Sequence, residues 1–320
     1  MSSADRINWL NVAFMIGTCG AAALAPFHLF LFAYAVLGPL HYLTEISWLH
    51  DRRYFAAHDR GRRGWLVLVA LAIAAMTYGF VSSDLLHRPV SPAIEIGMFY
   101  IAFAGAAIAL YVRHPVNAIA AVIVIGVGLA LFYTNPVYGI AAYLLITIIH
   151  VFVFTGCFIL YGATKSNSRS GMISAVVFVI CGVVALVADL PSVAPTAEIR
   201  SMYGSFEQLN VLLRRFFGGS ETSVMRFIAF AYTYHYLNWF SKTSVIGWHA
   251  VSRRRAVAII ATWLAAIAIY GYSFRAGFAV FYVLSALHVM LEFPLNHQSI
   301  AGLARELRVP RLRAIFASAR

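Results

Sequence analysis

The stretch His41-Tyr-Leu-Thr-Glu45-Ile-Ser-Trp-Leu-His50 has the spacing H-x3-E-x4-H, which returns at His288-Val-Met-Leu-Glu292-Phe-Pro-Leu-Asn-His297. A chain of this composition would contain roughly 0.01 copies by chance, so the second copy indicates an internal repeat. On a helix, a histidine and a glutamate four residues apart share one face, whereas a residue nine positions on points to the opposite side. Each copy therefore predicts a site built from its first histidine and its glutamate.

Both copies lie inside long apolar runs, and the whole chain shares this apolar character. Of its 320 residues, 62% are hydrophobic and 11% are charged, and its mean hydropathy is +0.79. Soluble domains carry about 25% charged residues. The sequence therefore predicts an all-α polytopic membrane helix bundle, a single integral-membrane domain over residues 1–320, in the inner (cytoplasmic) membrane of the cell.

Ten apolar runs approach the roughly 20 residues that a membrane-spanning helix requires. The runs lie near residues 8–24, 26–48, 64–82, 93–112, 116–133, 138–162, 172–189, 223–242, 255–274 and 277–296. We therefore expect about ten transmembrane helices. The first two are either separate helices joined by a tight turn around Ala25-Pro26 or one long bent segment.

Basic residues show which ends of these helices face the cytoplasm. They cluster in loops 51–63, 163–171 and 242–255 and in the C-terminal tail, whereas loops 83–92 and 134–137 carry almost none. By the positive-inside rule, the basic loops and both termini are cytoplasmic. The formal charge of +12 therefore reflects membrane topology, and we expect no nucleic-acid partner.

One loop differs from the others in length and composition. Residues 190–222 begin with Pro191 and Pro195 and continue with mixed polar and apolar residues. This pattern is typical of an amphipathic helix that lies in the membrane interface. We expect such a helix on the outer face.

Four histidines lie within the predicted spans, all on helices that run from outside to inside: His41, His150, His235 and His288. Each precedes the next basic residue by 7 to 17 positions, which places all four in roughly the inner half of the bilayer. Ionisable groups are costly at this depth, so the default inference is that they face the bundle interior and act there. We expect the four to meet in one layer.

A ring of neutral imidazoles with an open position suits a first-row metal that binds a small molecule. Each ligating histidine also needs an acceptor for its second nitrogen, which Glu45 and Glu292 can supply. These two carboxylates are the candidate catalytic residues, and they are alternatively direct ligands of the metal or of a second metal. The same histidines could instead bridge helices by hydrogen bonds or form a proton relay.

An aromatic face surrounds His235. Tyr232, Tyr236 and Trp239 lie on the same side of a helix as this histidine. Such a wall suits a flat, apolar, lipid-soluble ligand, although aromatic stripes in membrane helices also serve as packing or interface belts. We therefore expect an apolar small molecule as partner, besides membrane lipid.

In its length, its roughly ten apolar helices and its four intramembrane histidines, the chain resembles the Brp/Blh family of membrane β-carotene 15,15′-dioxygenases. The segment Leu37-Gly-Pro-Leu-His-Tyr-Leu-Thr-Glu-Ile-Ser-Trp-Leu-His-Asp-Arg52 also looks like stretches of bacterial carotene oxygenases. The resemblance implies a non-haem Fe(II) held by the four histidines, which binds O2 and splits the central double bond of a polyene. This chain departs from that pattern by the two glutamates.

Three alternatives to this carotenoid oxygenase remain open. A His/Glu di-metal oxidase or hydroxylase would use the glutamates as ligands. A proton- or ion-coupled transporter would use buried His/Glu pairs as a relay. A haem-binding membrane protein would use the histidines as axial ligands. Desaturase histidine boxes, Walker loops, GxGxxG, GxSxG and HExxH motifs are absent from the sequence, which removes many other membrane-enzyme families.

Overall fold

The computed structural model describes residues 2–56, 59–82, 86–88, 92–112, 144–242 and 251–317, together with the isolated positions 119, 122, 123, 126, 127 and 247. Within these residues all regular structure is helical. The elements before the largest gap are α1 (Ser3–Leu24), α2 (Pro26–Phe32), the π-helical η1 (Ala33–Leu37), α3 (Gly38–Asp51), the 3-10 turn η2 (Arg53–Phe55), α4 (Asp59–Phe80) and α5 (Pro92–Tyr111).

The elements after that gap begin with a second π-helical segment. They are η4 (Leu145–Phe154), α8 (Thr155–Ser166), α9 (Arg169–Val187), α10 (Ala197–Tyr203), the 3-10 turn η5 (Gly204–Phe206), α11 (Glu207–Phe217), α12 (Glu221–Ser241), α14 (Arg253–Tyr272) and α15 (Phe274–Ala317). The prediction of an all-α chain is confirmed for the described residues.

Seven helices within the described residues are long and apolar enough to cross a membrane. They are Ser3–Leu24, Pro26–Asp51, Gly61–Phe80, Thr147–Ser166, Arg169–Val187, Arg253–Tyr272 and Phe274–Leu307. The first two are separate helices, because Ala25 leaves the helical conformation at φ −140° and ψ 64°. This break confirms the turn expected at Ala25-Pro26.

The other three expected spans are not among the seven. The described apolar part of α5, Gly97–Tyr111, is shorter than a full span. The span expected over 116–133 lies almost entirely outside the described residues, as does the beginning of the one expected over 138–162. Helix α12 has 21 residues, but it carries charged and polar groups such as Arg226. The number of spans and their orientation stay predictions.

Local sequence signals fix several helix ends. Ser2 and Asp5 form a reciprocal capping box at the start of α1. Ser168, Ser220 and Ser252 each accept a backbone N–H at the start of α9, α12 and α14. Asn167 adopts the left-handed conformation after α8, with φ 49° and ψ 41°. The basic loop expected over 163–171 is therefore largely helical, with a tight link between α8 and α9.

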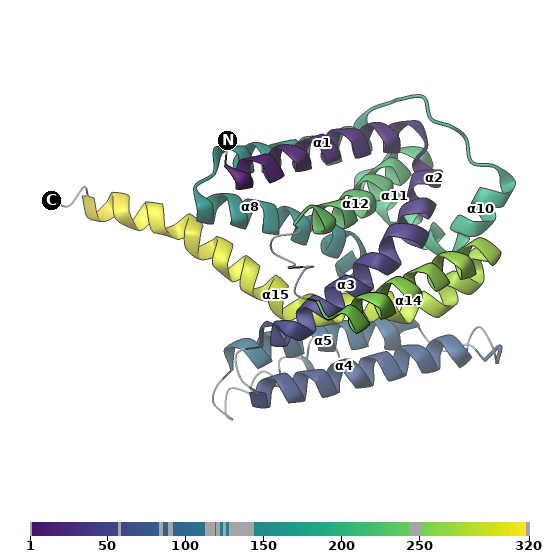
Figure 1. Cartoon of the computed structure of the whole chain (residues 1–320), viewed down its shortest axis with the longest axis horizontal. Helices are drawn as coiled ribbons and strands as arrows, with labels where there is room; N and C mark the ends of the chain where they lie inside the picture. The colour runs from purple at the N-terminus through teal and green to yellow at the C-terminus, as the bar shows by residue number, and fades with distance from the viewer. Residues whose placement is uncertain are drawn as a thin grey trace. The chain divides into compact units, whose positions relative to one another are not determined.

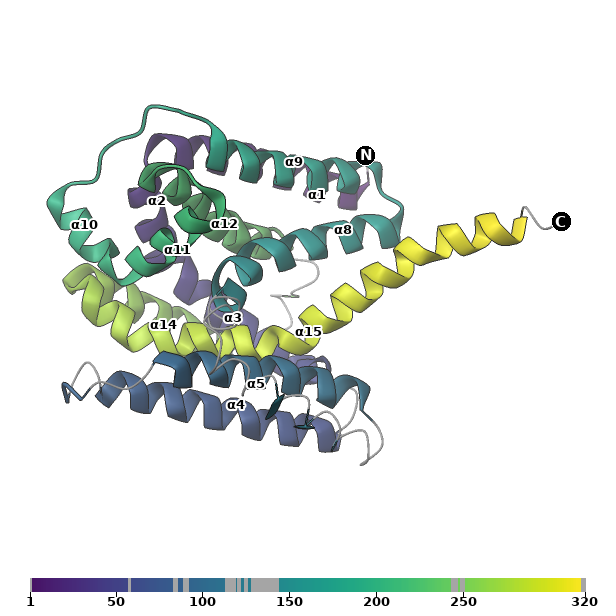
Figure 2. The same ribbon diagram turned by 180° about the vertical axis from the view of Figure 1, so that it is seen from behind.

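The chain divides into two compact units. The first unit contains Met1–His41, Val151–Gly277 and Ser299–Arg320. Within it, α12 packs against α1, α2 and α9, and these helices lie side by side in Figures 1 and 2. Nearly every residue of α12 from Ser223 to Tyr236 is buried, so its polar groups meet protein.

The second unit contains Tyr42–His150 and Phe278–Gln298. Helices α4 and α5 lie side by side in it (Figure 1). Its apolar core includes Trp65, Phe99, Met290 and Phe293, each at most 1% exposed. The residues on either side of the histidine and glutamate of the second sequence repeat on α15 belong to this core.

Candidate metal centre

His41 and His235 meet inside the first unit. His41 lies near the start of α3 and is 1% exposed, and His235 lies on α12 and is 7% exposed. Their Nε2 atoms are 3.1 Å apart, close enough to bind the same ion. With bonds of about 2.1 Å, two such nitrogens subtend roughly 95° at a shared ion, close to the angle between neighbouring octahedral ligands. The pair therefore fits a metal ion.

The second nitrogen of His235 has a defined partner. Its Nδ1 lies 2.8 Å from the hydroxyl oxygen of Thr155, the first residue of α8, which is 1% exposed. When Nε2 binds a metal, Nδ1 carries the proton and donates it to this oxygen. Thr155 thus holds the ring orientation of His235, and its hydroxyl can accept the Nδ1 proton when Nε2 binds a metal. The sequence contains no local pattern that pairs the two residues, which are 80 positions apart.

His150 and His288 meet inside the second unit. Their ring centroids are 5.2 Å apart, and each side chain is 2% exposed. Glu292 Oε2 lies 3.3 Å from His150 Nδ1, so this carboxylate contacts a histidine of another helix. The sequence suggests His288 as its neighbour, one turn away on α15, so the contact with His150 is a new result.

Tyr42 was also not predicted as a site residue. Its ring stacks on that of His288 within the second unit, with centroids 4.4 Å apart and an interplanar angle of 23°. Tyr42 stands inside the first repeat, next to His41, but a single aromatic residue in an apolar helix carries no signal of such a role. Glu45, one turn further along α3, is 2% exposed.

The predicted aromatic wall is present in part at the His41–His235 pair. The rings of Tyr236 and Trp239 lie 5.0 and 5.7 Å from that of His41. Tyr232 lies one turn before Tyr236 on α12 and packs against Phe30, with ring centroids 5.3 Å apart. Two of the three wall residues therefore border the pair, whereas Tyr232 is packed within an aromatic cluster.

The aromatic cluster continues into the loop that was expected to hold an interfacial helix. Residues 197–217 of that loop form α10, η5 and α11, which confirms that it is helical. Phe206 packs on Phe30 with centroids 4.7 Å apart, and Tyr203 packs on Phe27 at 5.3 Å. The loop therefore covers the aromatic end of α2.

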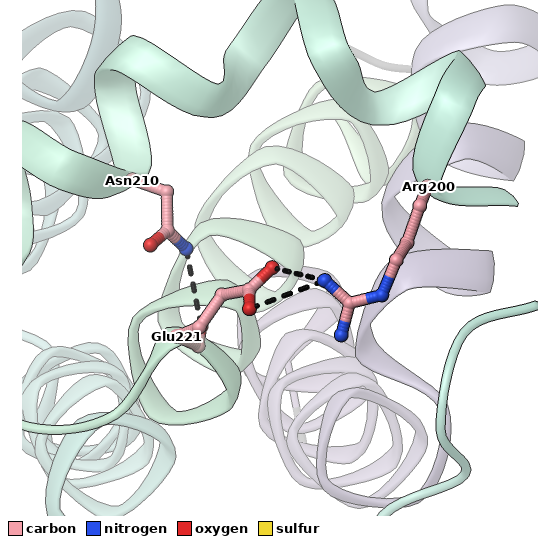
Figure 3. Close-up of polar contacts among 3 residues, drawn as sticks. All are labelled: Arg200, Asn210 and Glu221. Carbon is pink, nitrogen blue, oxygen red and sulfur yellow. Dashed lines mark hydrogen bonds and ion pairs between the residues drawn. The ribbon is translucent and has the colours of Figure 1, made fainter. Parts of the chain in front are cut away.

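Polar contacts attach this loop to the start of α12 (Figure 3). Arg200 on α10 approaches both carboxylate oxygens of Glu221, at 3.1 and 3.3 Å. Asn210 on α11 donates from Nδ2 to the backbone carbonyl of Glu221 at 3.1 Å. Both helices of the loop are thus bonded to the first residue of the helix that carries His235.

Each π-helical segment contains or closely precedes a candidate metal-binding histidine. Segment η4 contains His150, and η1 ends four residues before His41. In η1, the carbonyl of Val36 accepts a hydrogen bond from Trp263 Nε1 at 2.8 Å. Helices widen to the π form rarely and often at functional sites, so these segments support a role for the two histidines.

The last histidines of the two repeats do not join the clusters. His50 is exposed at the end of α3, next to Asp51. The Nε2 atom of His297 lies 2.9 Å from the backbone carbonyl of Phe103. The prediction that only the first histidine of each repeat belongs to a site is consistent with both positions.

Comparison with known proteins adds no family to this description: no family model, no curated protein and no solved structure matches the chain.

Proposed function

We propose that this chain is a non-haem metal oxygenase of the membrane, in which His41, His150, His235 and His288 bind one iron ion. The proposed substrate is a long apolar molecule of the carotenoid class. The observation that carries the proposal is the 3.1 Å separation of two buried Nε2 atoms, those of His41 and His235, within apolar helices. The two nitrogens lie at hydrogen-bond distance from each other, and a bound ion would replace that contact with two metal–nitrogen bonds.

We extend the proposal to all four histidines because all four are buried in apolar helical segments. His41, His150, His235 and His288 are 1%, 2%, 7% and 2% exposed. Ionisable groups buried in a membrane bundle usually have a function there.

The chain's own residues supply orientation and an apolar environment. Thr155 holds the ring of His235, and Glu292 lies where it can orient His150. Tyr236 and Trp239 provide flat apolar surface beside His41, which suits a polyene and excludes water. A bound iron would supply the site at which dioxygen binds.

The geometry of the first pair is less suited to haem. Two histidines that ligate one haem iron from opposite sides hold their nitrogens about 4 Å apart, with the ring between them. The nitrogens of His41 and His235 are 3.1 Å apart. Their separation therefore favours neighbouring ligands on a single ion.

A second function is favoured by one observation, the buried contact between His150 and Glu292. Paired imidazole and carboxylate groups inside a membrane bundle are typical of proton relays in transporters. The same contact is compatible with a di-metal oxidase that uses Glu45 and Glu292 as ligands. Metal content separates these functions, because a relay requires no metal and a di-metal site requires two ions.

The test is elemental analysis of purified full-length protein after reconstitution with Fe(II). We expect one iron per chain in the wild type and loss of most iron in His41→Ala, His235→Ala, His150→Ala and His288→Ala. His50→Ala is the matched control, because His50 lies on α3 but is exposed. Full iron content in all four variants, or none in the wild type, would refute the proposal. Oxygen uptake with β-carotene then tests the substrate class.

A further inference from the structure

Asn296 on α15 is a buried polar side chain that the proposed metal site does not use. It is 1% exposed, and neither its Nδ2 nor its Oδ1 atom has a hydrogen-bond partner within the part of the chain that the structure describes. A side-chain amide provides two donors and an acceptor oxygen. Burying these groups without partners is costly, so such groups in folded proteins nearly always contact a partner, a water molecule or a ligand.

The position of Asn296 on its helix connects it to the candidate metal centre. His288, Glu292 and Asn296 follow one another at intervals of four residues, so they lie on one face of α15. Eight residues of helix place Asn296 about 12 Å along the axis from His288. Glu292, between them, already contacts His150. The face therefore forms a buried polar stripe inside the second unit.

The residues after Asn296 attach α15 to its neighbours and point elsewhere. His297 contacts the carbonyl of Phe103 at 2.9 Å, and Gln298 donates to the carbonyl of Phe55 at 2.6 Å. Packing of α15 against these elements thus uses other side chains. Among the described residues, none donates a hydrogen bond to the Asn296 side chain or accepts one from it, so these residues do not account for a polar side chain at this position.

We propose that Asn296 binds a hydroxyl or carbonyl oxygen carried by the apolar substrate, at a point on the order of 12 Å from the metal-binding histidine His288. A neutral amide complements such an oxygen, because it can donate to a carbonyl or both donate to and accept from a hydroxyl. An anionic group is a poor match, since the Glu292 carboxylate lies on the same face. This inference rests on the proposed function for the apolar substrate, and it specifies the substrate class as an oxygenated polyene.

The test compares two polyenes of equal length, β-carotene and its dihydroxylated analogue zeaxanthin, by quenching of tryptophan fluorescence in detergent-solubilised full-length protein. We expect the wild type to bind zeaxanthin about three- to tenfold more tightly, the factor that one neutral hydrogen bond supplies. Asn296→Leu should bind both polyenes equally. Gln298→Leu is the matched control, because Gln298 already has a protein partner, and it should keep the preference.

Thermal unfolding of each variant, and Asn296→Ala as a second substitution, identify a variant that has failed to fold. The inference is overturned if Asn296→Leu and Asn296→Ala keep the wild-type preference, which would mean that the amide holds only water. It is also overturned if the wild type shows no preference or binds neither polyene. Binding is measured in iron-free protein, so it does not depend on the metal site. A preference for zeaxanthin that is lost when Asn296 is substituted, and kept in Gln298→Leu, therefore supports the inference even where elemental analysis refutes the metal site.

Discussion

His150 Nδ1 lies 3.3 Å from Glu292 Oε2, and both side chains are almost completely buried in the second unit. A carboxylate inside an apolar bundle is expensive unless a neighbour compensates it. The contact places Glu292 where it can orient His150. Experiment can distinguish two roles for the Glu292 carboxylate: it orients the metal-binding His150, or it binds the metal itself.

Replacement of Glu292 by Gln distinguishes these roles. If Glu292 orients His150, Glu292→Gln should still fill with iron at saturation, with an affinity about 10- to 100-fold weaker. If the carboxylate is a direct ligand, the site should remain empty. Iron titration with elemental analysis measures both, and Glu45→Gln applies the same test to the other repeat. Glu207→Gln on the exposed face of α11 is the control. An unchanged iron affinity in Glu292→Gln would show that the carboxylate neither orients His150 nor binds the metal.

Thr155→Val removes the hydroxyl that contacts His235 and leaves a side chain of nearly the same shape. We expect iron affinity to fall about 10- to 100-fold, because the ring of His235 loses the hydroxyl oxygen that holds its orientation. Thr155→Ser should restore most of the affinity. Thr164→Val is the matched control on the same helix, since that hydroxyl bonds to Leu160 within α8. Equal affinities in the two valine variants would contradict the role given to Thr155.

The features predicted successfully from the sequence are those set by local chemistry. Apolar run length predicted helices, and the proline after Ala25 predicted the break there. The span expected over 223–242 shows the limit of this approach. Helix α12 is long enough, but its polar groups are buried by neighbouring helices, which hydropathy does not report.

The pairing of the histidines could not be predicted in the same way. Counting residues to the next basic loop gives the depth of a side chain, but not the rotation of its helix about its own axis. That rotation decides that His41 meets His235 and that Glu292 meets His150. The contact of Thr155 with His235 depends on packing between α8 and α12, and nothing local in the sequence encodes it.

The predicted orientation can be tested with single cysteines. Ser201 on α10 and Ser166 at the end of α8 are both exposed. In a background without the three native cysteines, an impermeant thiol reagent added to spheroplasts should label Ser201→Cys and not Ser166→Cys, because basic residues near Ser166 predict a cytoplasmic position. Labelling after membrane disruption is the control for reactivity. The reverse pattern would invert the topology and the depth assigned to the histidines.

Arg226 and Arg200 provide a matched pair for stability. Arg226 on α12 is 3% exposed and donates to the backbone carbonyls of Ala188 and Leu190, just beyond the C-terminal end of α9. Arg200 contacts Glu221 at the surface, where the two side chains are 55% and 36% exposed. Both arginines make polar contacts, but only Arg226 makes them from a buried side chain.

Arg226→Met should therefore lower the free energy of unfolding by about 1–3 kcal/mol, because it removes the hydrogen bonds that a buried charged side chain donates. Arg200→Met should change it by about 0–1 kcal/mol, since exposed ion pairs contribute little. Arg226→Lys should fall between the wild type and Arg226→Met, because an ammonium group retains the charge but lacks the planar fork that reaches two carbonyls. Denaturation of the purified protein in mixed micelles, followed by circular dichroism, measures all three. Equal losses of unfolding free energy in Arg226→Met and Arg200→Met would show that the contacts of the buried Arg226 stabilise the fold no more than the surface ion pair does.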